Sequence, residues 1–301
     1  MNKSFKDGVQ WAWDATSISL AMTCPRKYQL KLLEGWEPKE LSVHLLFGQH
    51  YATGLEHFYK YRADGKSIDD ALALVVRERL EATWDPATNA PLPFAHAAKT
   101  RFTLIRSLVW YVEQFGHESE AAVSTLHLSD GKPAVEVSFS FELSDDILLC
   151  GHLDRIVEFN GAKYVMDQKT TGGTIGHYFF DQFKPDNQMS LYTLAGQVIL
   201  DSPIRGVIID GAQIAVGFTR FERGLTYRTK DELNEWWETA QAFIHQARSY
   251  SMLGQFPMNL ASCGNYGGCE FRRVCAASPK VRPEILKSDF IPYIWDPIQR
   301  R

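Results

Sequence analysis

The sequence has few cysteines, no long apolar run and no large excess of charge of one sign. Its five cysteines are an odd number, and no apolar stretch follows the first residues as a secretory signal requires. We therefore expect a cytoplasmic chain without a disulfide framework. No uninterrupted apolar run approaches the ~18 residues of a membrane span, so we expect no membrane partner. The formal net charge of -4 argues against a protein that coats nucleic acid by bulk electrostatics.

The sequence does carry enough apolar material for a sizeable core. Of its 301 residues, 45% are hydrophobic and 13% are aromatic, which excludes an intrinsically disordered chain. Apolar residues recur at helical spacing in the first third and alternate with polar residues after about position 121. The expected helices cover 17–35, 41–62, 67–84, 94–115, 186–200 and 229–253, and the expected strands cover 135–141, 147–159, 162–170, 204–213 and 218–228. This order predicts an α/β or α+β core.

A hairpin turn is the clearest local signal. Asn160-Gly161 lies between two strand-like runs, and this dipeptide is typical of a two-residue type I′ turn, in which both residues have positive φ. Residues that face each other across such a turn have numbers with a constant sum, so Asp154 is expected opposite Asp167, with Cβ atoms about 5 Å apart. Lys169 follows Asp167 by two residues and therefore shares its face of the sheet.

The apolar flanks decide between two interpretations of this acid pair. Two solvated carboxylates on an exposed hairpin would need no further explanation. Here the neighbours include Ile156, Val157, Val165 and Met166, which favour a central strand where like charges need a cation. Two hard oxygen ligands suit Mg²⁺ or Mn²⁺, and an adjacent lysine suits a phosphate or a hydroxide nucleophile. We therefore expect a divalent metal site.

The motifs on the two strands resemble those of a known family. G-H-L-D-R-I from Gly151 to Ile156, followed by D-Q-K-T from Asp167 to Thr170, resembles the PD-(D/E)XK nuclease superfamily. The similarity is greatest to its RecB/AddB-type branch, which includes the CRISPR-adaptation nucleases and many phage exonucleases. The resemblance implies an α/β, restriction-endonuclease-like core with a central mixed sheet flanked by helices. It also implies that Asp154, Asp167 and the backbone carbonyl of Gln168 bind the metal, while Lys169 assists the attacking water.

Two further site positions depend on the same resemblance. Gln188 and Tyr192 lie four residues apart on one helix face, a pair that alone is typical of any amphipathic helix. The RecB-type branch carries Q-x-x-x-Y after its D-x-K strand, which implies that both residues support the site and help hold DNA. The family also supplies a metal-binding histidine as G-x-x-x-H. Counted from Gly48 that position is Ala52, so either this ligand is absent or His50 replaces it with a change of register. The alternative interpretation of His50 is an ordinary helix histidine.

Three cysteines lie in a glycine-rich segment near the end of the sequence, Cys263-x5-Cys269-x5-Cys275. Structural zinc sites usually contain a closer C-x2–4-C pair, and three thiols are one short of a four-cysteine cluster. The resemblance implies Cys24, in a C-P-x-x-Y context, as the fourth ligand of a [4Fe–4S] cluster. Zinc on the same cysteines is the alternative. Cys150, inside an apolar strand, is expected to be a buried free thiol.

The resemblance extends from Cys24 to Cys275, so we expect one integrated domain. Its parts are an N-terminal helical region (1–120), a nuclease core (121–256) and a C-terminal cluster segment with a tail (257–301). Arg26, Lys27 and Arg155 are candidate DNA contacts.

The implied function is a Mg²⁺- or Mn²⁺-dependent DNA exonuclease. Its substrate would be single-stranded or end-containing DNA in recombination, repair or phage DNA processing. It would act in a bacterial or phage-infected cell, with a helicase or recombination partner as an open question. A non-catalytic DNA-binding accessory subunit with a structural cluster is the alternative.

Overall fold

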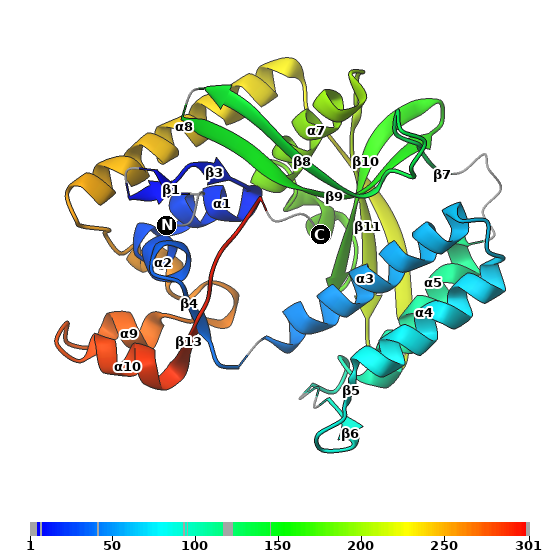
Figure 1. Cartoon of the computed structure of the whole chain (residues 1–301), viewed down its shortest axis with the longest axis horizontal. Helices are drawn as coiled ribbons and strands as arrows, with labels where there is room; N and C mark the ends of the chain where they lie inside the picture. Colours follow the sequence, from blue (N-terminus) through cyan, green and yellow to red (C-terminus); the bar gives the residue numbers. More distant parts are fainter. Residues whose placement is uncertain are drawn as a thin grey trace. The chain divides into compact units, whose positions relative to one another are not determined.

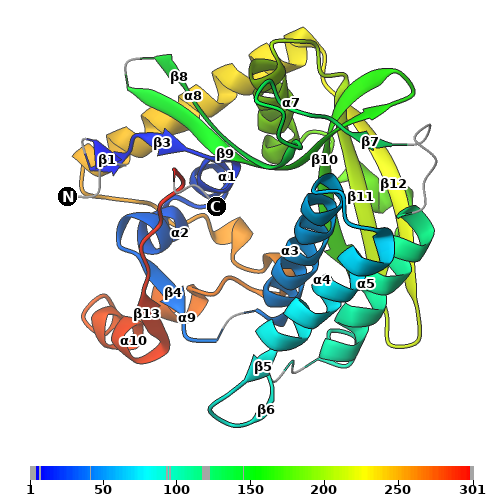
Figure 2. The same cartoon turned by 45° about the vertical axis from the view of Figure 1, so that its right-hand side comes forward.

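The computed structural model describes residues 5–6, 8–40, 42–92, 94, 96–116, 123–144 and 146–298. Contacts divide the chain into two compact units, whose elements are labelled in Figures 1 and 2. Unit 1 comprises Met1–Glu40, Ser138–Gly151 and Thr229–Arg301, and unit 2 comprises Leu41–Val137 and His152–Arg228. Strands β8 (Val135–Ser144) and β9 (Ile147–Phe159) contribute residues to both units. None of the helices in the described residues has both the length and the apolar character that a bilayer crossing needs.

Unit 2 is built on a mixed sheet in the order β12-β11-β10-β9. Strand β10 (Ala162–Thr171) pairs antiparallel with β9 and parallel with β11 (Gly206–Ile214). Strand β11 then pairs antiparallel with β12 (Thr219–Tyr227), and the short β7 (Ser124–Thr125) pairs with β9. Every residue of β11 is buried, as expected for a strand that is covered on both faces.

Helices cover both faces of this sheet. Three of them, α3 (Val43–Ala63), α4 (Ile68–Ala82) and α5 (Arg101–Phe115), share a core with Ala212, Ile214 and Phe221 of β11 and β12. Figures 1 and 2 show these helices grouped together. Between α4 and α5 lies a small hairpin of β5 (Trp84–Asp85) and β6 (Ala90–Pro91).

The opposite face carries α7 (Asn187–Leu200), which follows the short α6 (His177–Asp181). Gly196 of α7 packs on β10 so closely that a Cβ there would lie 2.9 Å from Val165 Cγ2. Val165 pairs with Val207, five residues before Ala212, and side chains an odd number of residues apart point to opposite faces. The sheet of unit 2 is therefore a middle layer between α7 and the three-helix group.

Unit 1 brings segments from both chain ends together. Helix α1 (Ala15–Thr23) packs on the long α8 (Lys230–Met252), and β4 (Trp36–Pro38) pairs with β13 (Phe290–Pro292). Strand β3 (Ala12–Trp13) pairs with the part of β9 that belongs to this unit. The remaining elements are β1 (Phe5–Lys6), β2 (Val9–Gln10), α2 (Pro25–Tyr28), the π-helix η1 (Gln29–Leu33), the 3₁₀ turns η2 (Leu260–Ser262) and η3 (Asn265–Gly267), α9 (Arg272–Ala276) and α10 (Arg282–Asp289).

The α/β fold class expected from the sequence, a central mixed sheet flanked by helices, is confirmed. Two expected helices have different bounds. The helix expected over 17–35 is divided at Cys24, because Pro25 lacks an N–H and disfavours helical backbone in the residue before it. The helix expected from 94 begins only at Arg101, where Thr100 caps its N-terminus in a capping box.

Candidate active site

The Asn160-Gly161 turn sets the register that brings two acids together. Asn160 has φ 49° and Gly161 has φ 70°, as a type I′ turn requires. The ladder runs from the turn to Arg155 opposite Met166, and the next pair in this register is Asp154 opposite Asp167. The hairpin predicted from the sequence is therefore confirmed. Both carboxylates point to the α7 face, because Asp167 is two residues from Val165.

The acid pair is held by short contacts within the hairpin. Asp167 is 1% exposed, whereas Asp154 and Lys169 are half-buried. The backbone N–H of Gln168 donates to Asp154 Oδ2 at 2.8 Å, and Lys169 Nζ lies 2.5 Å from Asp167 Oδ2. The ammonium group of Lys169 thus offsets part of the negative charge that the two carboxylates would place in a poorly hydrated site.

Burial and neighbouring charges change the ionisation of all three groups. Burial and the charge of Asp167 raise the pKa of Asp154 to about 7, and the Glu136 carboxylate adds to this increase. Burial also raises the pKa of Asp167, although Lys169 opposes the change. Burial alone would lower the pKa of Lys169, but Asp167 and Asp154 outweigh it and raise that pKa. The site therefore has surplus negative charge, which a divalent cation would compensate.

Helix α7 contributes the second part of the site. Gln188 Oε1 accepts a hydrogen bond from Lys169 Nζ at 2.8 Å, and Gln188 Nε2 donates to the Tyr192 hydroxyl at 3.0 Å. The structure thus brings Gln188 of the Q-x-x-x-Y motif to the lysine and Tyr192 to Gln188. Asp186 caps the N-terminus of α7, and its charge raises the pKa of both Asp167 and Lys169. The sequence motifs do not single out Asp186, although its position before the helix is typical of a cap.

His50 is not brought into contact with the acids. Its ring lies 6.3 Å from that of Phe94, and its Nε2 is buried without a hydrogen-bond partner in the part of the chain that the structure describes. Burial and then the charge of Arg79 lower the pKa of His50. Among the described residues, no group of three or more His, Cys, Asp or Glu side chains could hold a metal ion. A role for His50 as a metal ligand stays a prediction.

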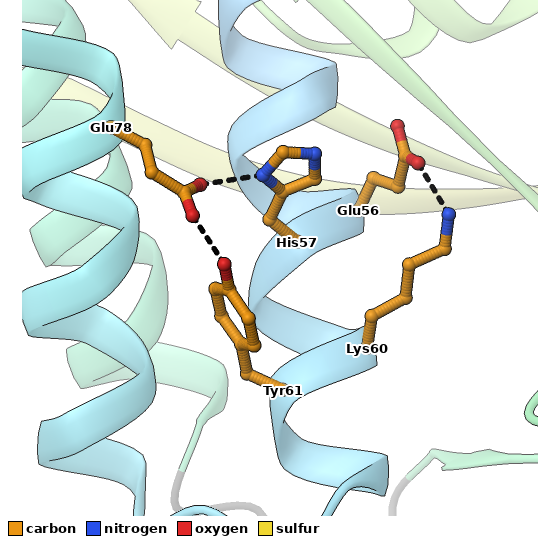
Figure 3. Close-up of polar contacts among 5 residues, drawn as sticks. All are labelled: Glu56, His57, Lys60, Tyr61 and Glu78. Carbon is orange, nitrogen blue, oxygen red and sulfur yellow. Dashed lines mark hydrogen bonds and ion pairs between the residues drawn. The ribbon is translucent and has the colours of Figure 1, made fainter. Parts of the chain in front are cut away.

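Another histidine of α3 is used in helix packing. His57 Nδ1 lies 2.5 Å from Glu78 Oε2, and the Tyr61 hydroxyl donates to the other oxygen of Glu78 (Figure 3). Glu78 belongs to α4, so this network joins two neighbouring helices. Burial would raise the pKa of Glu78, but the hydrogen bonds from His57 and Tyr61 outweigh it and lower that pKa. Glu56 and Lys60 pair separately along α3 in the same view.

Arg155 is buried within the described structure. It follows Asp154 in β9 and therefore points to the other face of the sheet, where it is 2% exposed. Its guanidinium stacks 3.7 Å from the ring centroid of Tyr59 in α3. Asp210 is nearby and accepts hydrogen bonds from the Tyr111 hydroxyl at 2.5 Å and from Arg223 Nε at 3.2 Å. Arg155 is therefore packed against α3 within the described structure, and its predicted role as a DNA contact stays a prediction.

The four cysteines predicted as cluster ligands share one region of unit 1. Cys24 Sγ accepts a hydrogen bond from the backbone of Asn259 at 3.4 Å, and Cys263 Sγ donates to the carbonyl of the same residue at 3.7 Å. Cys269 N donates to Cys263 O at 3.0 Å. Burial, followed by the charge of Cys269, raises the pKa of Cys275, and Cys24 acts in the same direction. The thiols are therefore neighbours, but among the described residues no three of them form a group that could hold a metal ion.

The other predicted residues of unit 1 have structural contacts. Lys27 Nζ lies 2.8 Å from Glu270 Oε2, and Arg26 Nε donates to Phe256 O at 2.8 Å. Both contacts join the N-terminal segment to the C-terminal one, while a role in DNA binding stays a prediction. Cys150 is fully buried and unbridged, as expected, and burial raises its pKa strongly.

Comparisons with known proteins agree with this geometry. A family model of the PD-(D/E)XK nuclease superfamily matches residues 12–276. None of the curated proteins matches the chain. Among the solved structures that match is a "Putative exonuclease" from Eubacterium rectale, with a TM-score of 0.52 and 12% sequence identity over 92% of each chain. At this identity the likeness shows a shared fold alone.

Proposed function

Because this chain belongs to the PD-(D/E)XK nuclease superfamily, we propose that it is a Mg²⁺- or Mn²⁺-dependent deoxyribonuclease, acting as an exonuclease on single-stranded or end-containing DNA. The observation that carries the proposal is the buried cluster of Asp154, Asp167 and Lys169. A purely structural hairpin gains nothing from two acids that repel each other in its buried part. We assign the activity to recombination, repair or phage DNA processing in the cytoplasm, where a helicase or recombination partner would supply unwinding.

The donor set at the hairpin fits a hard divalent cation. Mg²⁺ retains several waters and needs only one or two carboxylates from the protein, so two acids and one backbone carbonyl are sufficient. Asp154, Asp167 and the carbonyl of Gln168 would hold it. When bound, the metal makes water more acidic and neutralises charge on the phosphate. The raised pKa of both acids supports this assignment, because each is destabilised as an anion until a cation is present.

Lys169 acts on the scissile phosphate as a cation. Its raised pKa keeps the amine protonated, so its role is to donate hydrogen bonds and stabilise developing negative charge rather than to remove a proton. Gln188 limits the directions in which Nζ can point, and Tyr192 in turn fixes the amide of Gln188. This arrangement orients the lysine before substrate arrives.

We further propose that Cys24, Cys263, Cys269 and Cys275 hold a [4Fe–4S] cluster, with zinc as the alternative metal. Support comes from the family resemblance around Cys24 and from the proximity of the thiols to one another in unit 1. Such a cluster would cross-link the two ends of the chain and stabilise unit 1.

A degradation assay tests the nuclease proposal. Labelled single- and double-stranded DNA, blocked at the 5′ or 3′ end, is incubated with Mg²⁺, Mn²⁺ or EDTA. We expect metal-dependent loss of terminal nucleotides, at least a hundredfold slower for Lys169→Ala and for Asp167→Asn. Lys163→Ala is the matched control, because Lys163 lies in the same strand but bonds to Ser202 instead of the site. Equal rates for wild type and Lys169→Ala would exclude the nuclease.

The accessory-subunit alternative makes a different prediction in the same assay. It expects DNA binding without cleavage in any metal. The observation that favours it is that no group of three or more His, Cys, Asp or Glu side chains among the described residues could hold a metal ion.

A further inference from the structure

Three basic side chains gather at the start of α3 without an acidic partner. The rings of His44 and His96 lie 4.9 Å apart in an edge-to-face arrangement, and Lys99 Nζ lies 4.5 Å from the ring centroid of Phe47. Burial lowers the pKa of His44, and the charges of His96 and Lys99 lower it further. None of the three basic groups forms an ion pair within the described residues. Basic groups thus gather where no acidic side chain of the described residues pairs with them.

Lys99 is the central observation. The residue is 1% exposed, and its ammonium has no hydrogen-bond partner among the described residues. Burial lowers its pKa to about 8. The ring of Phe47 offers a cation–π contact, but a buried ammonium is normally paired with an anion as well. Such a cation is therefore a candidate for pairing with an external anion.

Backbone N–H groups at the start of α3 add to the positive potential around these three side chains. Helix α3 has 21 residues, its N-cap Ser42 makes no side-chain cap hydrogen bond, and its first turn contains no acid. The unsatisfied N–H groups of a long helix carry partial positive charge, which attracts anions. His96 Nδ1 accepts hydrogen bonds from the backbone N–H groups of Ala98 and Lys99 at 3.1 Å, which leaves its proton on Nε2 as a donor. Charge and donors both favour an anion.

The cluster lies close to the strand that carries the catalytic lysine. Gly48, one helical turn after His44, approaches β10, where a Cβ on Gly48 would lie 3.5 Å from Thr170 Oγ1. Thr170 directly follows Lys169. An anion bound by His44, which is exposed, would therefore lie near the end of β10 that carries Lys169, but on the α3 face of the sheet, opposite the face to which the acids point.

We propose that His44, His96 and Lys99 form a second phosphate-binding site, which holds the backbone of the DNA strand that the active site cleaves. The inference rests on the proposed nuclease function and names a substrate contact that the motifs do not. Lys99 would supply a buried positive charge, the two imidazoles would supply N–H donors, and the start of α3 would supply its dipole. The site positions substrate and takes no part in the reaction itself.

The test measures binding of a fluorescent oligonucleotide by anisotropy, in EDTA so that metal contacts do not contribute. Lys99→Met keeps the length and apolar stem of the side chain but removes its charge. We expect about tenfold weaker binding, the effect of losing one charge-assisted contact. The slope of log affinity against log salt should fall by about 0.7 for a single strand. Lys132→Met, at a lysine that is 77% exposed and pairs with Asp130, is the control and should bind as wild type does.

Thermal unfolding separates binding from a structural role. Because Lys99→Met removes an unpaired buried charge, its melting temperature should equal or exceed that of wild type. Inorganic phosphate should raise the melting temperature of wild type but not of Lys99→Met. Unchanged DNA affinity and salt slope in Lys99→Met would overturn the proposal, and so would weaker binding that merely accompanies a lower melting temperature.

The proposed site could bind either a terminal phosphate or an internal phosphodiester of DNA, and the chemistry of the 5′ end distinguishes the two. Oligonucleotides with a 5′-phosphate and with a 5′-hydroxyl are compared. If Lys99→Met affects only the phosphorylated one, the site takes a terminal monoester, and if it affects both equally, the site takes an internal diester. The proposed nuclease can fail separately: undiminished cleavage by Asp167→Asn would exclude that function, whereas the binding result depends on Lys99 alone.

Discussion

Replacing Asp154 by Asn should stabilise the metal-free protein while removing its activity. Asn keeps an oxygen to accept the hydrogen bond from Gln168 N but has no charge to be repelled by Asp167. Burial and that repulsion raise the pKa of Asp154 from 3.8 to about 7. A difference of about three pH units corresponds to about 4 kcal/mol at most. Asp154 is half-buried, and its ionisation is coupled to that of Asp167. We therefore expect Asp154→Asn to raise the free energy of unfolding by about 2 kcal/mol, or the melting temperature by about 5 °C.

The stability difference between wild type and Asp154→Asn should depend on pH, and the raised pKa of Asp154 gives its direction. Below about pH 4, Asp154 is protonated in both the folded and the unfolded chain, so wild type and Asp154→Asn should unfold alike. Between about pH 4 and 7 the unfolded chain ionises first, because the folded pKa is the higher one. Wild type therefore loses stability relative to the variant as the pH rises through this range. Above about pH 7 the difference stays constant.

Calorimetry in EDTA from pH 4 to 8.5 measures the difference directly. Asp201→Asn is the control, because Asp201 ends α7 in a left-handed conformation that asparagine also adopts. Adding Mg²⁺ should reduce the difference in stability between wild type and Asp154→Asn. The cation binds wild type more tightly and compensates the charge of its two carboxylates. A gap that is independent of pH, or a variant that is less stable at every pH, would refute the argument that the acids repel each other.

Two further predictions concern residues outside the acid pair. Arg155→Ala should lower the free energy of unfolding in urea by about 3 kcal/mol, because it leaves a cavity under Tyr59. The folded variant should bind DNA within twofold of wild type, and a larger loss would support Arg155 as a DNA contact. Protein purified without oxygen should be brown and contain iron, which Cys24→Ser should lose and Cys150→Ala should keep. Colourless protein with stoichiometric zinc would contradict the cluster.

The sequence predicted the acid pair because the determinants are local. One Asn-Gly turn fixes the register of the hairpin, and the register alone places Asp154 opposite Asp167. The motif predicted that Gln188 supports the site, but not its hydrogen bond with Lys169, since strand and helix meet only after α7 packs on β10.

Burial was harder to predict than pairing. Arginine is a residue type that often contacts DNA, which is why Arg155 was predicted to do so. Its burial depends on α3, which covers the other face of the sheet. The surroundings of His50 and the proximity of Asp186 to the acids likewise depend on how helices pack on strands. Such long-range packing leaves no period or spacing in the sequence around each residue.

The absence of a side chain at Gly196 has a consequence for how this protein tolerates change. A larger residue there forces α7 or its neighbours to shift, because a Cβ would lie 2.9 Å from Val165 Cγ2 and 3.0 Å from Ile204 Cγ1. Gln188 is carried by the same helix, eight residues earlier, so a shift of α7 moves the amide away from Lys169. In a library of random variants, position 196 should consequently be as intolerant as the positions proposed to be catalytic, although it is not itself a proposed contact of metal or DNA.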